Sequence, residues 1–116
     1  MYRCTMKSAL IFFVIIFSSS LVAHEVDKPP ALWSWFKDMK VTKKQCITKS
    51  FLALSEVGIT NASQNDYGFY GSINNNTIVV KCLSIDSANS KVMVAVAGSD
   101  YKSVEHLRNN IIGSIK

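Results

Sequence analysis

The sequence predicts a two-layer α+β domain, in which a three-stranded antiparallel meander carries two helices on one face. Three observations predict this fold: two segments with helical capping signals and periodicity, three short strand-like runs between them, and turn residues that join the runs. Two amphipathic helices bury their apolar sides most simply against one face of one sheet. The expected order of elements is therefore α-β-β-β-α.

The first helix is expected from about residue 43 to residue 57. Thr42 and Gln45 have the spacing of a capping box, and Gly58 supplies a residue that can end a helix in the left-handed conformation. The helix carries an apolar stripe, formed by Cys46, Ile47, Leu54 and Val57 with Phe51 and Ala53 at its flanks. Cys46 is therefore expected to face the core.

Three strand-like runs, at residues 67–73, 77–85 and 91–98, follow a loop at residues 61–66. Asn74, Asn75 and Asn76 tolerate positive φ and join the first two runs, while the segment "DSANS" joins the last two. Side chains alternate across a strand, so the middle run has two faces, Ile78, Val80 and Cys82 on one and Val79, Lys81 and Leu83 on the other.

A second helix is expected from Ser99 or Asp100, which can cap it, to about residue 115. Its apolar side consists of Val104, Leu107, Ile111 and Ile115, with Tyr101 and Ile112 beside them. The chain is therefore predicted to close with a helix that packs on the sheet.

The first 23 residues have the pattern of a signal peptide. Arg3 and Lys7 precede the apolar run "ALIFFVIIF", and small residues lead to a cleavage position after Ala23. The apolar segment is shorter than the roughly 18 to 20 residues of a membrane-spanning helix, although an uncleaved anchor is the alternative. Cleavage would leave a leader at residues 24–41 and one α+β domain at residues 42–116, in the periplasm or secreted.

Charge and cysteine content narrow the class of protein further. The chain has 13 basic and 8 acidic residues, but two of the basic ones lie in the signal peptide, and lysine dominates over arginine. A lysine-rich composition suits neither bidentate binding of phosphate nor recognition of base edges, so no nucleic-acid partner is expected. Cys46 and Cys82 remain after cleavage and predict a disulfide in an oxidising compartment, with two free buried thiols as the alternative.

Several short motifs are spread between residues 42 and 115. They comprise Cys46, Ala53, Leu54, Gly58, Tyr70, Gly71, Cys82, Val96, Ala97, Gly98 and Leu107. With these motifs the sequence resembles small bacterial periplasmic α+β proteins that have a helix-to-strand cysteine pair and a Val-Ala-Gly strand end. The resemblance implies the fold and export, and it supplies no catalytic residue or ligand.

No catalytic constellation is expected, and the protein is predicted not to be an enzyme. Ser99, Asp100 and His106 could suggest a hydrolytic triad, but the sequence has no nucleophile elbow, and the first two are better explained as helix caps. No cofactor or metal is expected. One alternative is a copper site at His24, which cleavage would make the mature N-terminus, with His106 as the second ligand.

The segment "ALWSWFKDMKVTKK" has the most unusual composition of the mature chain. Aromatic side chains beside lysines suit a membrane interface or a protein partner, so membrane contact is expected only through residues 33–44 or an uncleaved signal. Alternatively, the segment folds back and covers apolar surface of its own chain. That surface would be the outer face of the sheet, where Val79 and Leu83 lie beside a third strand that is apolar on both sides, with either Val92, Val94 and Val96 or Met93, Ala95 and Ala97 facing outward.

Three occupants of the outer face are therefore considered: the aromatic segment, a second copy of the chain, or a different protein. The function that the sequence predicts is an exported, non-catalytic protein-binding module, with a periplasmic inhibitor or immunity protein as the alternative. The predicted contact surface consists of Trp33, Trp35, Phe36, Tyr70, Val79, Lys81 and Leu83.

Overall fold

Five antiparallel strands form one sheet in the computed structural model, which describes residues 28–66 and 68–116. The strands are β1 (Ala31–Met39), β2 (Ser63–Asn65), β3 (Gly68–Ile73), β4 (Asn76–Ser84) and β5 (Ser90–Gly98), and their order across the sheet is β1-β5-β4-β3-β2. The helices are α2 (Lys43–Glu56) and α3 (Tyr101–Ser114). In this part of the chain, no helix has the length and apolar character needed to cross a membrane.

The prediction of a three-stranded meander was wrong, although the fold class remains α+β. The meander exists as β3, β4 and β5, but one further strand pairs at each of its sides. β1 comes from the segment assigned to the leader and pairs with β5 from Ala31↔Gly98 to Met39↔Ser90. Aromatic residues favour strands, and the alternation of Trp33, Ser34 and Trp35 suits a strand with one buried side. β2 pairs with β3 over three residues within the predicted loop.

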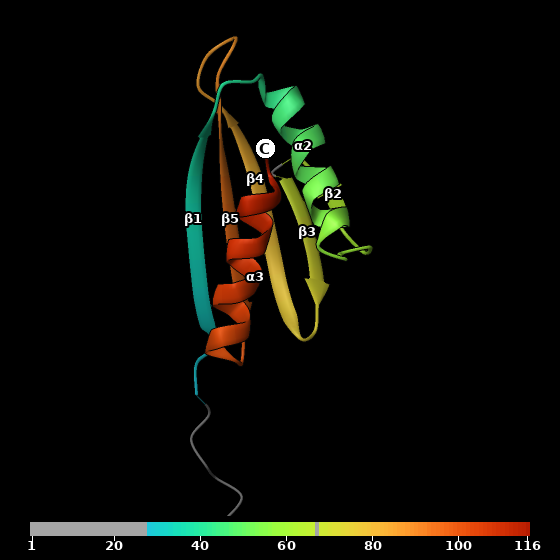
Figure 1. Cartoon of the computed structure of the whole chain (residues 1–116), viewed down its shortest axis with the longest axis vertical. Helices are drawn as coiled ribbons and strands as arrows, with labels where there is room; N and C mark the ends of the chain where they lie inside the picture. The colour runs from blue at the N-terminus through green and yellow to red at the C-terminus, as the bar shows by residue number, and fades with distance from the viewer. Residues whose placement is uncertain (1–27, 67) are drawn as a thin grey trace, which may run out of the picture.

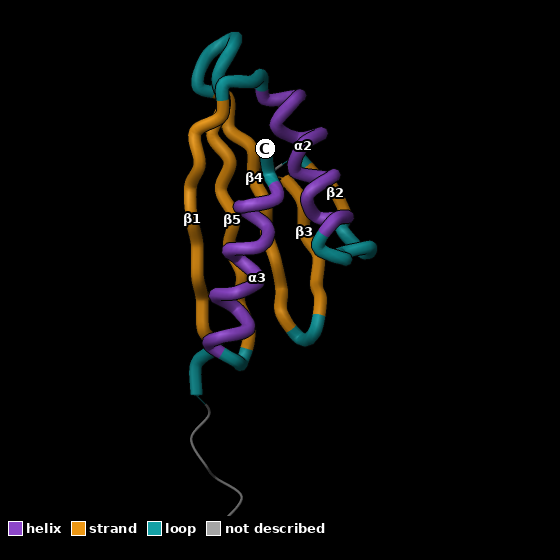
Figure 2. Tube along the Cα trace, in the orientation of Figure 1, coloured by secondary structure: helices purple, strands orange, loops and turns teal. Residues whose placement is uncertain are grey.

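Both helices lie on the same face of the sheet, as expected (Figure 1). α3 packs over β1 and β5, and α2 packs mainly over β4. Coloured by secondary structure, Figure 2 shows the two layers clearly, with the helices in front of the strands. Between the layers lie the most deeply buried apolar side chains, including Leu54, Ile78, Val80, Val92, Val94, Val96, Val104, Ile111 and Ile115.

The alternation along the strands decides which side chains reach this core. Ile78 and Val80 have no exposed surface and Cys82 is buried, which confirms the inner face predicted for β4. The sequence left open which set of β5 residues faces inward, and the structure places Val92, Val94 and Val96 in the core. Met93, Ala95 and Ala97 therefore belong to the opposite face.

Local signals set the ends of the elements. The Thr42 hydroxyl accepts a hydrogen bond from the Gln45 backbone N–H at 3.2 Å, and the Thr42 N–H donates to Gln45 Oε1 at 3.1 Å, which forms the predicted capping box. Gly58, with φ of 90°, follows α2. Asn74 and Asn75 adopt φ of 51° and 64° in the turn between β3 and β4, a conformation that asparagine tolerates better than most residues.

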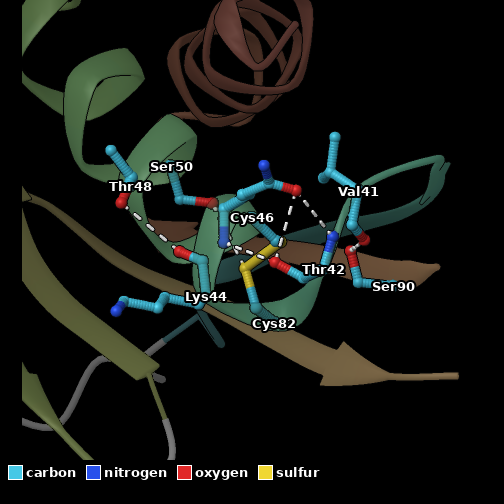
Figure 3. The surroundings of a disulfide bond; sticks show 9 residues. Val41, Thr42, Lys44, Cys46, Thr48, Ser50, Cys82 and Ser90 are labelled. Carbon is cyan, nitrogen blue, oxygen red and sulfur yellow. Dashed lines mark hydrogen bonds between the residues drawn. A yellow bond between two sulfur atoms is a disulfide. The ribbon is translucent and has the colours of Figure 1, made fainter. Parts of the chain in front are cut away.

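A disulfide joins Cys46 of α2 to Cys82 of β4, as predicted, and ties the helical layer to the sheet (Figure 3). The two Cα atoms are 6.1 Å apart, and Ser50 Oγ lies 3.4 Å from Cys82 Sγ. Beside it, the Ser90 hydroxyl of β5 donates to the Val41 carbonyl oxygen at 2.8 Å, just before α2 begins. These contacts fix the N-terminal end of α2 on β4 and β5.

Candidate functional site

The face of the sheet that points away from both helices, called here the outer face, carries a continuous apolar patch. Residues opposite each other in an antiparallel pair share a face, so the register assigns the side chains. The outer apolar patch consists of Leu32, Phe36, Tyr70, Val79, Leu83, Met93, Ala95 and Ala97. The polar positions of this face on the four longest strands are Ser34, Asp38, Ser72, Thr77, Lys81 and Lys91.

The patch has small side chains at its centre and larger side chains around them. Ala95 of β5 pairs with Val79 of β4 on one side and with Ser34 of β1 on the other. Ala97 pairs with Leu32 of β1. Because alanine side chains are short, Ala95 and Ala97 form a shallow part of the outer face, while Met93 of the same strand is long.

Several side chains of the patch are open to solvent. Leu32 is 69% exposed, Phe36 53%, Leu83 41% and Tyr70 39%. Residues 28–66 and 68–116 place both helices on the opposite side of the sheet, so neither helix covers these side chains (Figure 1). The outer face is therefore an apolar surface that the described chain leaves open to solvent.

The charges of the outer face lie mainly at one corner. Lys91 Nζ is 3.5 Å from Asp38 Oδ1, and the same ammonium group lies 5.9 Å from the centre of the Phe36 ring. Lys81 is half-buried among the strands. The face therefore carries both signs of charge around an apolar centre and has no strong field of either sign.

The seven residues predicted as the contact surface separate into two groups. Phe36, Tyr70, Val79, Lys81 and Leu83 lie together on the outer face. Trp33 and Trp35 lie on the helical side, because they pair with Val96 and Val94. The prediction that the aromatic segment covers the outer face was therefore wrong, since this segment extends the sheet sideways as β1.

Trp33 and Trp35 take part instead in a cluster with α3. The Trp33 ring meets the Tyr101 ring edge-on at 5.2 Å, and the Arg108 guanidinium carbon lies 5.1 Å and 5.5 Å from the centres of the Trp33 and Trp35 rings. Arg108 Nη1 also donates to the Ser34 carbonyl oxygen at 3.1 Å. Sequence reasoning missed Arg108, although its spacing of seven from Tyr101 puts both on one side of a helix.

Each edge of the sheet has a feature that hinders pairing with another strand. A strand that paired with β1 would have to compete with Arg108 for the Ser34 carbonyl oxygen. At the opposite edge, β2 has only three residues. Short edge strands and a cationic side chain over an edge are common protections against edge-to-edge pairing. The open surface of this sheet is therefore its face.

The residues considered for chemistry are spread over different places. Asp100 caps α3 by accepting a hydrogen bond from the Ser103 backbone N–H at 3.3 Å, and His106 is exposed on that helix. His24 and the signal-peptide residues lie outside the described residues. In the described part of the chain, no three His, Cys, Asp or Glu side chains are grouped to hold a metal ion.

Comparisons with known proteins add no relative. No model of a known protein family matches the chain, and no curated protein matches it. The resemblance to small periplasmic proteins stays a prediction.

Proposed function

We propose that the protein is an exported, non-catalytic protein-binding module that uses the outer face of its sheet as the contact surface. The open apolar patch carries this proposal. Large contiguous apolar patches on a protein surface usually mark interaction sites. Leu32 and Phe36 are more than half exposed within such a patch.

The pattern of the outer face supports a covered surface rather than a solvated one. A sheet face in contact with water usually carries polar residues at alternate positions of each strand. Here Met93, Ala95 and Ala97 follow one another on the outer side of β5, the strand between β1 and β4. Covering this continuous apolar line would stabilise a complex by about 25 cal/mol for each Å² of apolar surface removed from water.

The disulfide supports export. Disulfides persist in oxidising compartments and are rare in the cytosol, and small exported domains use them to supplement a thin core. Cys46 and Cys82 are bonded between the two layers. A small disulfide-linked scaffold of this kind suits a binding role outside the cytosol.

Site-specific photo-crosslinking in the native compartment tests the proposal. A photo-reactive amino acid replaces Leu83, which is 41% exposed on the outer face, in the full-length protein. The matched control replaces Leu52, which is 61% exposed on α2 in the other layer. We expect a discrete protein adduct from position 83 and none at position 52.

The adduct must also depend on the patch. A Val79→Lys substitution, placed beside Tyr70 and Ala95 on the outer face, should abolish crosslinking from position 83 because it buries a charge against the partner. A circular dichroism spectrum and a cooperative unfolding transition like those of the wild type show that this variant is folded. The absence of any adduct at position 83, or equal adducts at both positions, would contradict the proposed function.

A further inference from the structure

We propose that the outer face packs against the outer face of a second copy of this chain, so that two sheets form the core of a symmetric β-sandwich. This inference rests on the proposed function and names its partner. The aromatic segment of the same chain is excluded as the cover, because residues 31–39 form β1 within the sheet. The extent, composition and symmetry of the outer face each favour a second copy.

The outer face is large enough for a stable dimer. Three strands of nine residues and the six-residue β3, spaced by about 4.8 Å and rising by about 3.3 Å per residue, give a face of about 520 Å². Two such faces would bury about 1,050 Å², which is just above the roughly 1,000 Å² that a biological interface with good complementarity needs. Stacked sheets in sandwiches use this same mode of contact, about 10 Å apart.

The apolar side chains of the face include a central strip that an interface would bury. β1, β4 and β5 contribute seven apolar side chains and five polar ones. The most buried part of an interface is its most apolar part, and Met93, Ala95 and Ala97 form such a strip along β5. The charged pair Asp38 and Lys91 lies at a corner of the face, where an interface rim would place it.

The arrangement of large and small side chains is self-complementary. A two-fold axis parallel to the strands and midway between β4 and β5 would place β4 of one copy over β5 of the other. The register then sets Val79 over Ala95 of the second copy and Tyr70 over Ser34. Lys81 would lie over Met93 and Lys91 over Leu83, so neither lysine would lie directly over its own counterpart in the second copy.

Pairing of two copies through the edges of their sheets is less favourable than stacking of the two faces. Pairing through β1 would disturb the Arg108 guanidinium, which holds the Ser34 carbonyl oxygen and lies over both tryptophan rings. Pairing through β2 would use a strand of three residues. A second copy therefore gains most by stacking on the face.

Sedimentation velocity over a range of concentrations tests the inference on the disulfide-bonded protein produced from the full-length sequence. We expect a dimer that forms at about 10 μM, at the weak end of the affinities of specific protein interfaces. Leu83→Lys combined with Leu32→Lys should weaken dimerisation at least about tenfold. Both leucines are well exposed in the single chain, so the variant should fold.

Leu52→Lys is the matched control, because it adds the same charge at an exposed leucine of α2. A dimer that this control weakens, and that the outer-face variant leaves intact, would overturn the inference. A wild-type chain that stays monomeric at about 500 μM would overturn it too. If position 83 nevertheless crosslinks to a different protein in the native compartment, the proposed function stands and only the second copy is wrong. If position 83 crosslinks to nothing, both fail.

Discussion

Single residues where the sheet meets α3 show how closely the layers fit. Gly98 ends β5 beside Asn76, which is 3% exposed and whose side-chain amide donates to Ser103 Oγ of α3 at 3.1 Å. A Cβ at position 98 would clash with the Asn76 side-chain oxygen and lie 3.0 Å from Val104 Cγ2. The absence of a side chain at Gly98 therefore lets a buried polar bridge form between β4 and α3.

Gly98→Ala should lower the free energy of unfolding by about 1 to 3 kcal/mol, because Asn76 must move and its hydrogen bond to Ser103 is lost. Chemical denaturation measures this change. Gly113→Ala is the control, since a Cβ there meets nothing within 4 Å, and alanine favours a helix over glycine. Equal effects of the two substitutions would show that the space at Gly98 has no structural importance.

The disulfide is the second residue-scale feature that stability measurements can test. Cys46 and Cys82 are separated by 36 residues, and the chain-entropy model gives about 4 kcal/mol for closing a loop of that size. Replacing both cysteines by alanine should therefore lower the free energy of unfolding by about that amount. Denaturation of the variant and of the wild type under non-reducing conditions measures the loss, and equal midpoints would contradict the prediction.

Asp86 in the turn between β4 and β5 gives a pH-dependent prediction. Its carboxylate accepts hydrogen bonds from the backbone N–H groups of Ala88 and Asn89, each at 2.8 Å, and from the Asn89 side chain. The Ala88 hydrogen bond, followed by the Asn89 side chain, lowers the pKa of this carboxyl below its ordinary value of 3.8.

Because the folded pKa lies below the unfolded one, this turn is stabilised above pH 3.8, and the stabilisation is lost as the pH falls through the folded pKa. The carboxyl resonance of Asp86, followed by NMR, should titrate below 3.8. A midpoint at or above that value would show that the turn does not favour the ionised form.

At the scale of elements, local signals were predictable and long-range pairing was not. The capping box at Thr42 and the asparagine turn between β3 and β4 act within a few residues, so the sequence predicted α2 and the pairing of β3 with β4. β1 was missed because its only partner in the sheet is β5, far along the chain. β2 was missed because three polar residues carry no strand period.

The same reason explains which part of the candidate surface was predictable. The alternation along β4 correctly separated Val79, Lys81 and Leu83 from the core side chains. The face on which Trp33 and Trp35 lie depends on the register between β1 and β5. Composition alone does not contain this register, so the tryptophans were grouped with the wrong face.

The cluster of α3 with β1 makes a prediction at the element scale. Arg108→Ala removes the guanidinium from two tryptophan rings and from the Ser34 carbonyl oxygen, so it should cost about 1 to 2 kcal/mol of stability. Lys102→Ala is the control at an exposed position of the same helix. Thermal or chemical denaturation that shows no difference between the two variants would rule out a stabilising role for the cluster.

At the scale of the whole molecule, the two faces of the sheet have different roles. The helices and the disulfide bury the inner face, while the outer face keeps an apolar patch open to solvent. β1 widens this open face by adding Leu32 and Phe36 to it. The strand that the sequence placed in a leader is therefore part of the surface through which we propose that the protein acts.

Hydroxyl-radical footprinting in the native compartment tests that central claim most directly. Phe36 and Tyr70 on the outer face are 53% and 39% exposed, and Phe51 and Tyr101 on the helical layer are 50% and 56% exposed, so Phe51 is a matched control for Phe36 and Tyr101 is a more exposed reference for Tyr70. If the outer face is an interface, Phe36 and Tyr70 should be oxidised much more slowly than their controls. Oxidation of Phe36 as fast as Phe51, and of Tyr70 at the rate its exposure predicts, would show that the outer face meets only water.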